Sequence, residues 1–85
     1  MNNNKILIRL YVPLIEKSYD LYIPINKKVG TIKSLIEKGL NELTDNIYMP
    51  SKETNFYSKE TGAIYDINQT VRDTDLKNGS KIILI

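Results

Sequence analysis

The stretch LKNGSKIILI, residues 76–85, joins a turn signal to a run of aliphatic residues. Its Asn78-Gly79 pair predicts a tight turn, because asparagine and glycine readily adopt the left-handed backbone conformation that such turns require. The four aliphatic residues that follow, 82–85, predict a β-strand. This is the most hydrophobic segment of the chain, so we expect its strand to contribute directly to the core.

Two further strands are predicted near the N-terminus. Residues 5–12, KILIRLYV, alternate between apolar positions on one face and Leu7, Arg9 and Tyr11 on the other. Residues 19–25, YDLYIPI, alternate in the same way. A short loop that begins at Pro13 separates the two runs, which predicts an antiparallel hairpin.

The hydrophobic period changes from two to that of a helix in residues 31–43, TIKSLIEKGLNEL. We expect Thr31 to cap this helix, since its hydroxyl can accept a hydrogen bond from an amide of the first turn. Gly39 lies inside the helical segment and weakens it by about 1 kcal/mol relative to alanine. The apolar stripe has to be buried, so the helix is predicted to lie across one face of a sheet.

The second half of the chain predicts another hairpin and a short helical turn. Residues 55–58 and 63–67 are the two expected strands, with Gly62 in the turn between them. Thr70 and Asp73 have the spacing of a weak capping box for a single helical turn. The last strand can then enter beside the first and parallel to it through a right-handed crossover.

The predicted fold class is therefore α+β, with a mixed sheet of about five strands and one helix packed across it. This architecture is the β-grasp, or ubiquitin-like, fold. Residues 1–85 form one domain, and residues 1–4 are expected to be a disordered start. The predicted core consists of Ile8, Leu10, Leu21, Ile23, Leu35, Ile36, Phe56, Ile82 and Leu84.

The opposite face of the sheet is the candidate partner-binding surface. Strand alternation assigns seven residues to this outer face: Leu7, Arg9, Tyr11, Tyr22, Tyr57, Ile83 and Ile85. Tyrosine and arginine are enriched at protein interfaces, which favours a binding role. Isolated apolar side chains on an open sheet are also ordinary, so the interpretation depends on whether these residues form a contiguous patch. The helix surface with Lys33, Glu37 and Lys38 is the next candidate.

Composition argues against catalysis. The chain has no histidine and no cysteine, which excludes Ser-His and Cys-His nucleophiles and zinc sites built from these residues. Residues 73–84 start like a calcium loop, but Lys77 and Leu84 occupy ligand positions, so we expect no metal there. No phosphate-binding glycine loop is present. We therefore predict no catalytic residue, no cofactor and no metal.

The charge and hydropathy of the chain predict a protein as its partner, rather than nucleic acid or a membrane. The 12 basic and 10 acidic residues are interspersed and give a formal net charge of +2. This balance gives no strong field for nucleic acid or anionic lipid. No apolar run is long enough to span a membrane, and residues 1–5, MNNNK, do not open a signal peptide. The expected location is cytoplasmic, with no membrane insertion.

The layout of the chain resembles ubiquitin over nearly its whole length. It is more similar to the YukD/EsaB-type ubiquitin-like proteins of type VII (ESX-type) secretion systems in Gram-positive bacteria. The segments that carry this resemblance are YDLYIP at 19–24, the helix that follows, and NGSKIILI at 78–85. The resemblance implies a cytosolic accessory or regulatory component of the secretion machinery that acts through protein–protein contacts.

An alternative function within the same fold is a ubiquitin-like modifier or a sulfur carrier. Such proteins work through a flexible tail that ends in Gly-Gly, because an activating enzyme adenylates the terminal carboxylate inside a narrow channel. Here Leu84 and Ile85 are expected to belong to the last strand, and no glycine follows them. The sequence therefore favours a non-conjugated binding module over a modifier or carrier.

Overall fold

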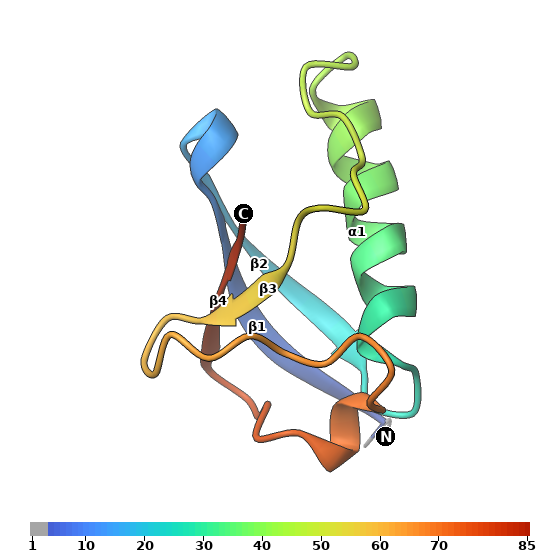
Figure 1. The fold of residues 1–85 in the computed structure, drawn as a ribbon, viewed down its shortest axis with the longest axis vertical. Coiled ribbons are helices and arrows are strands. Elements are labelled where there is room, and N and C mark those ends of the chain that lie inside the picture. Colours follow the sequence, from blue (N-terminus) through green and yellow to red (C-terminus); the bar gives the residue numbers. More distant parts are fainter. Residues whose placement is uncertain (1–3) are drawn as a thin grey trace.

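The structure is a computed structural model that describes residues 4–85 (Figure 1). Four strands, one α-helix and two short 3-10 helices follow one another along this part of the chain. Their bounds are β1 Lys5–Val12, η1 Pro13–Ile15, β2 Lys17–Pro24, α1 Val29–Leu43, β3 Phe56–Ser58, η2 Val71–Asp73 and β4 Ser80–Leu84. The predicted disordered start lies outside the described residues except for Asn4, whose carbonyl accepts a hydrogen bond from the Ile25 amide at 2.7 Å.

The four strands form one mixed sheet in the order β2-β1-β4-β3. β1 pairs antiparallel with β2 along its whole length, and β4 pairs antiparallel with β3. β1 and β4 are parallel neighbours, with Leu10 opposite Ile82 and Tyr11 opposite Ile83. The prediction that the last strand lies beside the first is thus confirmed, and the two strands form the centre of the sheet.

Helix α1 covers one face of the sheet, and the core lies between them (Figure 1). Every second residue of β1 and β4 points into this layer, because side chains alternate between the two faces of a strand. Six of the nine predicted core residues are buried in this layer, and two more, Leu21 and Ile36, are partly buried and pack against it. The buried hydrophobic residues are Ile8, Leu10, Val12, Ile23, Val29, Ile32, Leu40, Tyr48, Phe56, Val71, Ile82 and Leu84.

The prediction that Leu35 belongs to the core is wrong. Its side chain is 61% exposed, whereas Ile32 and Leu40 of the same helix are buried. The helix begins at Val29, two residues before the expected start, and Thr31 is not its cap. The stripe that meets the sheet is centred on Val29, Ile36 and Leu40, which turns Leu35 to the side of the helix.

The first turn of α1 is capped by another part of the chain. The amides of Val29 and Gly30 donate to the carbonyls of Gln69 and Ile67, both at 2.9 Å. A Cβ atom on Gly30 would lie 3.0 Å from the Ile67 carbonyl oxygen, so glycine permits this close approach. These two bonds satisfy helix amides that have no partner within the helix, which makes a side-chain cap unnecessary.

The same contacts explain why the sheet has four strands rather than about five. Residues 63–67, expected as a strand, pair with β3 only through an isolated bridge between Tyr57 and Ile64. The turn before them is as predicted, since Gly62 has a φ of 74°. Beyond Tyr65 the backbone leaves β3 to reach the start of α1, and a regular strand cannot continue.

The predicted helical turn is present as η2, but it has no capping box. Thr70 stands at the N-cap position and makes no side-chain cap hydrogen bond. The turn is fixed instead by burial of Val71 and by backbone bonds to the loop before α1: the Val71 amide donates to the Lys27 carbonyl at 2.9 Å.

The Asn78-Gly79 turn is tied directly to β1. Gly79 has a φ of 89°, as the sequence predicts, and its amide donates to the Leu7 carbonyl at 2.8 Å. The Asn78 side-chain oxygen accepts from the Leu7 amide at 2.7 Å. After β4, Ile85 exchanges two backbone hydrogen bonds with Asn55, so the ladder continues beyond Leu84.

Among the helices of residues 4–85, none is long and apolar enough to cross a membrane.

Candidate protein-interaction surface

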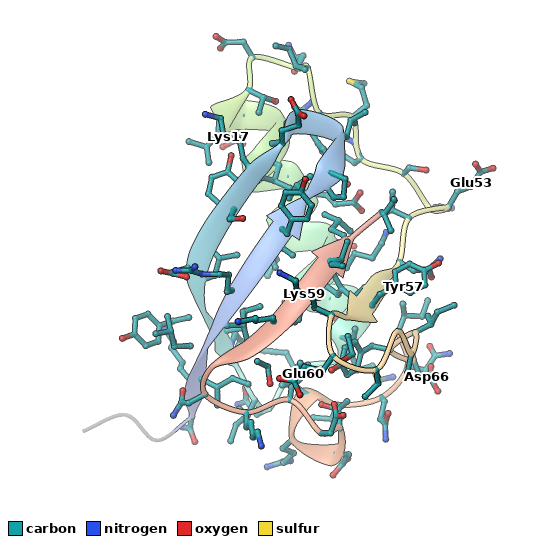
Figure 2. All side chains as sticks on the ribbon, turned by 90° about the vertical axis from the view of Figure 1, so that its left-hand side faces the viewer. Lys17, Glu53, Tyr57, Lys59, Glu60 and Asp66 are labelled. Carbon is teal, nitrogen blue, oxygen red and sulfur yellow. The ribbon has the colours of Figure 1, made fainter. Side chains whose placement is uncertain are left out.

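Figure 2 looks onto the face of the sheet that α1 leaves uncovered, with Tyr57 labelled. Strand register and alternation place all seven predicted outer-face residues on this face. Strand register arranges its side chains in rows that run across the strands, because directly opposite residues lie about 5 Å apart on the same face. One row joins Tyr22 and Leu7. The other end of the face holds a row of three residues on three adjacent strands: Tyr11, Ile83 and Tyr57.

A charged row lies between these two rows. Asp20, Arg9 and Lys81 are opposite one another on β2, β1 and β4. The Arg9 Nε donates to Asp20 Oδ1 at 2.9 Å, and Nη2 donates to Oδ2 at 3.3 Å. This hydrogen bond lowers the pKa of the Asp20 carboxyl. The charged row separates Leu7 from Tyr11 and Ile83, so the seven residues share one face without forming a single apolar patch.

We call the row of Tyr11, Ile83 and Tyr57 the tyrosine row. Its central residue, Ile83, is half-buried and stands opposite Tyr11 on one side and Tyr57 on the other, and Tyr11 is 36% exposed. Ile85 follows the end of β4 on the same face and is 60% exposed. Tyr22 is exposed at the opposite end of the sheet. The structure thus brings four of the predicted residues together and places Leu7 and Tyr22 apart from them.

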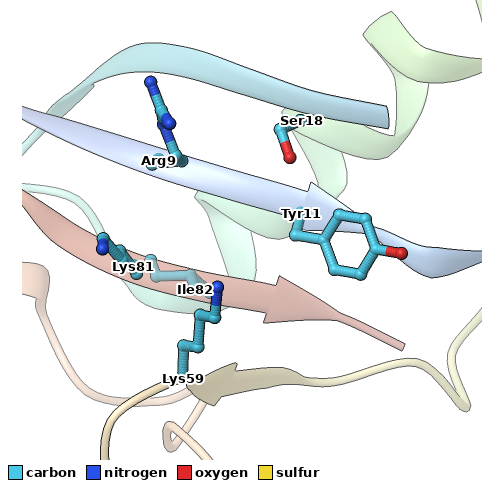
Figure 3. Close-up of a pocket in the computed structure, with 6 residues that line it drawn as sticks. All are labelled: Arg9, Tyr11, Ser18, Lys59, Lys81 and Ile82. Atoms are coloured by element: carbon cyan, nitrogen blue, oxygen red, sulfur yellow. The ribbon is translucent and has the colours of Figure 1, made fainter. Parts of the chain in front are cut away.

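A shallow pocket of about 220 Å³ opens beside the tyrosine row (Figure 3). Lys59, which follows β3, and Lys81 of β4 border it, together with Arg9. The pocket therefore combines cationic groups with the ring of Tyr11. Its other lining residues are Ser18 and Ile82.

Sequence reasoning missed both lysines of this pocket. The alternation that assigns Ile83 to the outer face also assigns Lys81, so the signal for this residue was present in the strand pattern. Lys59 follows β3 in the predicted turn, and its position cannot be read from alternation. Its amide donates to the Lys81 carbonyl at 3.0 Å, which holds the two lysines side by side.

The helix surface that was the next candidate does not exist as expected, because two of its three charged residues are buried. Glu37 is 3% exposed and Lys33 is 8% exposed. Lys33 Nζ donates to Glu37 Oε1 and to the Ser51 carbonyl, both at 2.8 Å. Only Lys38 remains at the surface, so a partner cannot use this charged group as a unit.

Glu37 is the centre of a buried polar network. Besides Lys33, it accepts hydrogen bonds from the Tyr48 hydroxyl at 2.7 Å, the Thr54 hydroxyl at 3.0 Å and the Ser51 amide at 3.3 Å. Burial alone raises the pKa of Glu37, but these four donors outweigh it and lower the pKa below its ordinary value. Burial and the Glu37 carboxylate raise the pKa of Tyr48. The network fastens residues 48–54 to α1.

The chain matches no protein-family model, and no curated protein matches it in sequence. Solved structures nevertheless share its fold. A chain from "Molecular Mimicry of SUMO promotes DNA repair" aligns with a TM-score of 0.74 at 19% identity, covering 100% of this chain and 95% of that one. Caldiarchaeum subterraneum ubiquitin aligns with a TM-score of 0.69 at 16% identity, covering 94% and 90%.

A third similar structure is part of a secretion complex. A chain of the "MycP5-free ESX-5 inner membrane complex, State II" aligns with a TM-score of 0.76 at 12% identity. The match covers 96% of this chain and 21% of the other, so the similarity concerns one region of a longer protein. At these identities the comparisons show the fold: the chain has the ubiquitin-like β-grasp fold, with one helix packed on a mixed four-stranded sheet.

Proposed function

We propose that this chain is a non-conjugated ubiquitin-like binding module, and that it serves as an accessory or regulatory component of a bacterial type VII secretion system. It works in the cytoplasm through contact with a protein of the secretion machinery, without catalysis and without a cofactor. Two observations support the secretion link: the resemblance of residues 19–24 and 78–85 to the YukD/EsaB-type proteins, and the shared fold of the ESX-5 chain.

The tyrosine row is the observation that carries the binding role. Tyr11, Ile83 and Tyr57 stand on three hydrogen-bonded strands, so their backbone positions are fixed before a partner arrives. Binding then costs little conformational entropy. Tyrosine offers a large apolar ring together with a hydroxyl, and Arg9 supplies a cation nearby. Aromatic residues and arginine are the groups most enriched at the centres of protein interfaces.

The binding role is tested by the double substitution Tyr11→Ser with Ile83→Thr, which removes apolar surface from the tyrosine row. The variants are used as bait in pull-downs from the native host, and recovered secretion-machinery proteins are quantified by mass spectrometry. We expect recovery to fall by about tenfold or more, as for the loss of central interface residues. Circular dichroism first establishes that the variant keeps its fold.

The matched control is Tyr22→Ser, which removes an exposed tyrosine from the same face at its other end. We expect this variant to recover the partner as well as the wild type does. Equal loss in both variants, or no loss in either, would contradict the assignment to the tyrosine row. The secretion link has its own test: type VII substrates in the culture medium are measured after deletion of the gene and after complementation with each variant.

A further inference from the structure

The two edges of the sheet differ in what covers them. At the β3 edge, the chain returns on itself: the Ser58 amide donates to the Ala63 carbonyl, and the Tyr65 amide donates to the Phe56 carbonyl, both at 2.9 Å. Within residues 4–85, no comparable segment lies along β2. In the part of the chain that the structure describes, the eight residues of Lys17–Pro24 have a strand neighbour on one side only, which is β1.

Two hydrogen bonds near the start of β1 identify which β2 groups face outward. The Ile25 amide donates to the Asn4 carbonyl, and the Leu7 carbonyl accepts from the Gly79 amide in the turn before β4. Odd residues of β1 therefore bond β4, and even residues bond β2. In the antiparallel register this turns the backbone groups of Ser18, Asp20 and Tyr22 away from the sheet. Such a row of open donors and acceptors is a template for another strand.

An apolar groove of about 260 Å³ lies directly beside this open edge, between β2 and α1. Leu35 and Leu43 form its helix side and are 61% and 73% exposed. Gly39 lies between them, and a Cβ atom built on it would have nothing within 4 Å. The full lining is Tyr19, Leu21, Leu35, Ile36, Gly39, Leu40 and Leu43.

We propose that a second copy of this chain occupies the open edge and the groove, and that the two copies form a symmetric dimer through β2 and α1. The helix and strand surfaces are each self-complementary. Leu35, Gly39 and Leu43 are spaced by four residues, so they form one stripe along the helix. This stripe is symmetric about Gly39, with a leucine on each side. A two-fold axis at Gly39 places Leu35 of each copy against Leu43 of the other.

The strand edge has the same symmetry about Leu21, which lines the same groove as Gly39. With Leu21 opposite its own copy, Asp20 pairs with Tyr22, and the inner side chains Tyr19 and Ile23 also meet. The alternative two-fold axis at Asp20 would place two carboxylates directly opposite each other, which is destabilising. Of these two registers, charge favours the one centred on Leu21.

The size of this contact sets the expected affinity. An eight-residue strand spans about 26 Å, and a sheet with one covering helix is about 20 Å deep. Two such faces bury roughly 1,000 Å² in total, the lower end for a specific interface. We therefore expect a dimer with a dissociation constant of about 10 μM or weaker.

The dimer goes beyond the proposed binding function and does not depend on it. Pairing through β2 would join the two sheets into one continuous sheet of eight strands, with both helices on the same side. The tyrosine row lies on the sheet face that the helices leave uncovered. The dimer contact therefore does not cover it. Each dimer would thus present two partner-binding faces in one plane.

Cysteine cross-linking tests the register, because the natural chain contains no cysteine. In the proposed pairing the Leu21 Cα atoms of the two copies lie about 4.5 Å apart, within disulfide range. The Tyr22 Cα atoms lie about 8 Å apart, beyond that range. Under mild oxidation we expect Leu21→Cys to form a disulfide-linked dimer at least about tenfold faster than Tyr22→Cys. Equal rates, or faster reaction of Tyr22→Cys, would overturn the proposal.

Sedimentation equilibrium up to about 1 mM protein tests association of the unmodified chain. We expect the wild type to dimerise and Gly39→Arg to be monomeric, because an arginine at the two-fold axis blocks helix contact and meets its own positive charge. The matched control is Ser34→Arg, an exposed position on the opposite side of the helix, which we expect to dimerise like the wild type. A wild type that stays monomeric at every concentration would overturn the proposal, and an extended segment of another protein would then be the occupant to test.

Discussion

On one flank of helix α1, Leu35 and Leu43 face solvent, while on the other flank Lys33 and Glu37 are buried. Side-chain type alone predicts the reverse. The difference arises from what lies beside each flank. Residues 48–54 cross the polar flank and supply Tyr48, Ser51 and Thr54 as partners for the Glu37 carboxylate. The apolar flank lies beside the open edge of β2, which no described residue covers.

On the two flanks of this helix, burial follows the path of the connecting segment rather than the hydrophobic pattern. A buried ion pair is costly unless further hydrogen bonds satisfy its oxygens. Within residues 4–85, no buried side-chain nitrogen or oxygen lacks a hydrogen-bond partner. The polar flank is therefore a fixed structural contact, whereas the apolar flank is available for association.

The largest effect is expected at the polar flank. Glu37→Ala removes the acceptor of four hydrogen bonds and leaves the Lys33 ammonium buried without its counter-ion. We expect the free energy of unfolding to fall by about 3–5 kcal/mol, measured by chemical denaturation. The matched control is Glu42→Ala, an exposed glutamate of the same helix, which we expect to change stability by less than about 0.5 kcal/mol. Similar losses for both variants would show that the network is not structural.

A smaller contrast is expected between two leucines of α1. Leu40 is buried in the core, so Leu40→Ala is expected to cost about 2–5 kcal/mol. Leu35 lines the groove and is mostly exposed, so Leu35→Ala is expected to cost less than about 1 kcal/mol in the monomer. Thermal denaturation at low protein concentration measures both without a contribution from association. If Leu35→Ala lowered the free energy of unfolding as much as Leu40→Ala does, Leu35 would have to be part of the core.

The smallest effect is a pH dependence carried by Glu37. Its pKa in the folded protein lies below the ordinary value of 4.5, so its carboxylate stabilises the fold above that pH. This contribution is lost as the pH falls from about 4.5 through the folded-state pKa. We expect the stability difference between the wild type and Glu37→Gln to be constant near neutral pH and to shrink in acid. A difference that grows on acidification would contradict the direction of the shift.

Much of the fold could be predicted because it is encoded locally. The alternation of residues 5–12 fixes β1 to the residue, and the Asn78-Gly79 turn places β4. The residue at which α1 begins could not be predicted from the local sequence. Its first amides donate to the carbonyls of Ile67 and Gln69, which lie more than 35 residues away along the chain. The same long-range contact shortened the expected fifth strand. Tertiary contacts overrode the local pattern at these positions.

The sequence predicted which residues lie on the candidate surface, but it did not predict how they are arranged there. Alternation assigned Tyr11, Tyr57 and Ile83 to one face, and strand register then placed them in one row. The charged row that separates them from Leu7 depends on Asp20 standing opposite Arg9, which follows from a hairpin loop length that the sequence leaves open. The burial of Glu37 depends on the path of residues 48–54, for which no periodic signal exists.

The parallel pairing of β1 with β4 has a consequence for synthesis of the chain on the ribosome. The Leu7 amide donates to the side chain of Asn78, which is added to the growing chain 71 residues later. At about 5–20 residues per second, translation needs roughly 4–14 seconds to supply that partner. Throughout this interval one side of β1 has no neighbouring strand, even after β2 and α1 have been synthesised. The nascent chain thus passes through a stage with an unpaired aliphatic strand, in which chaperone binding competes with aggregation.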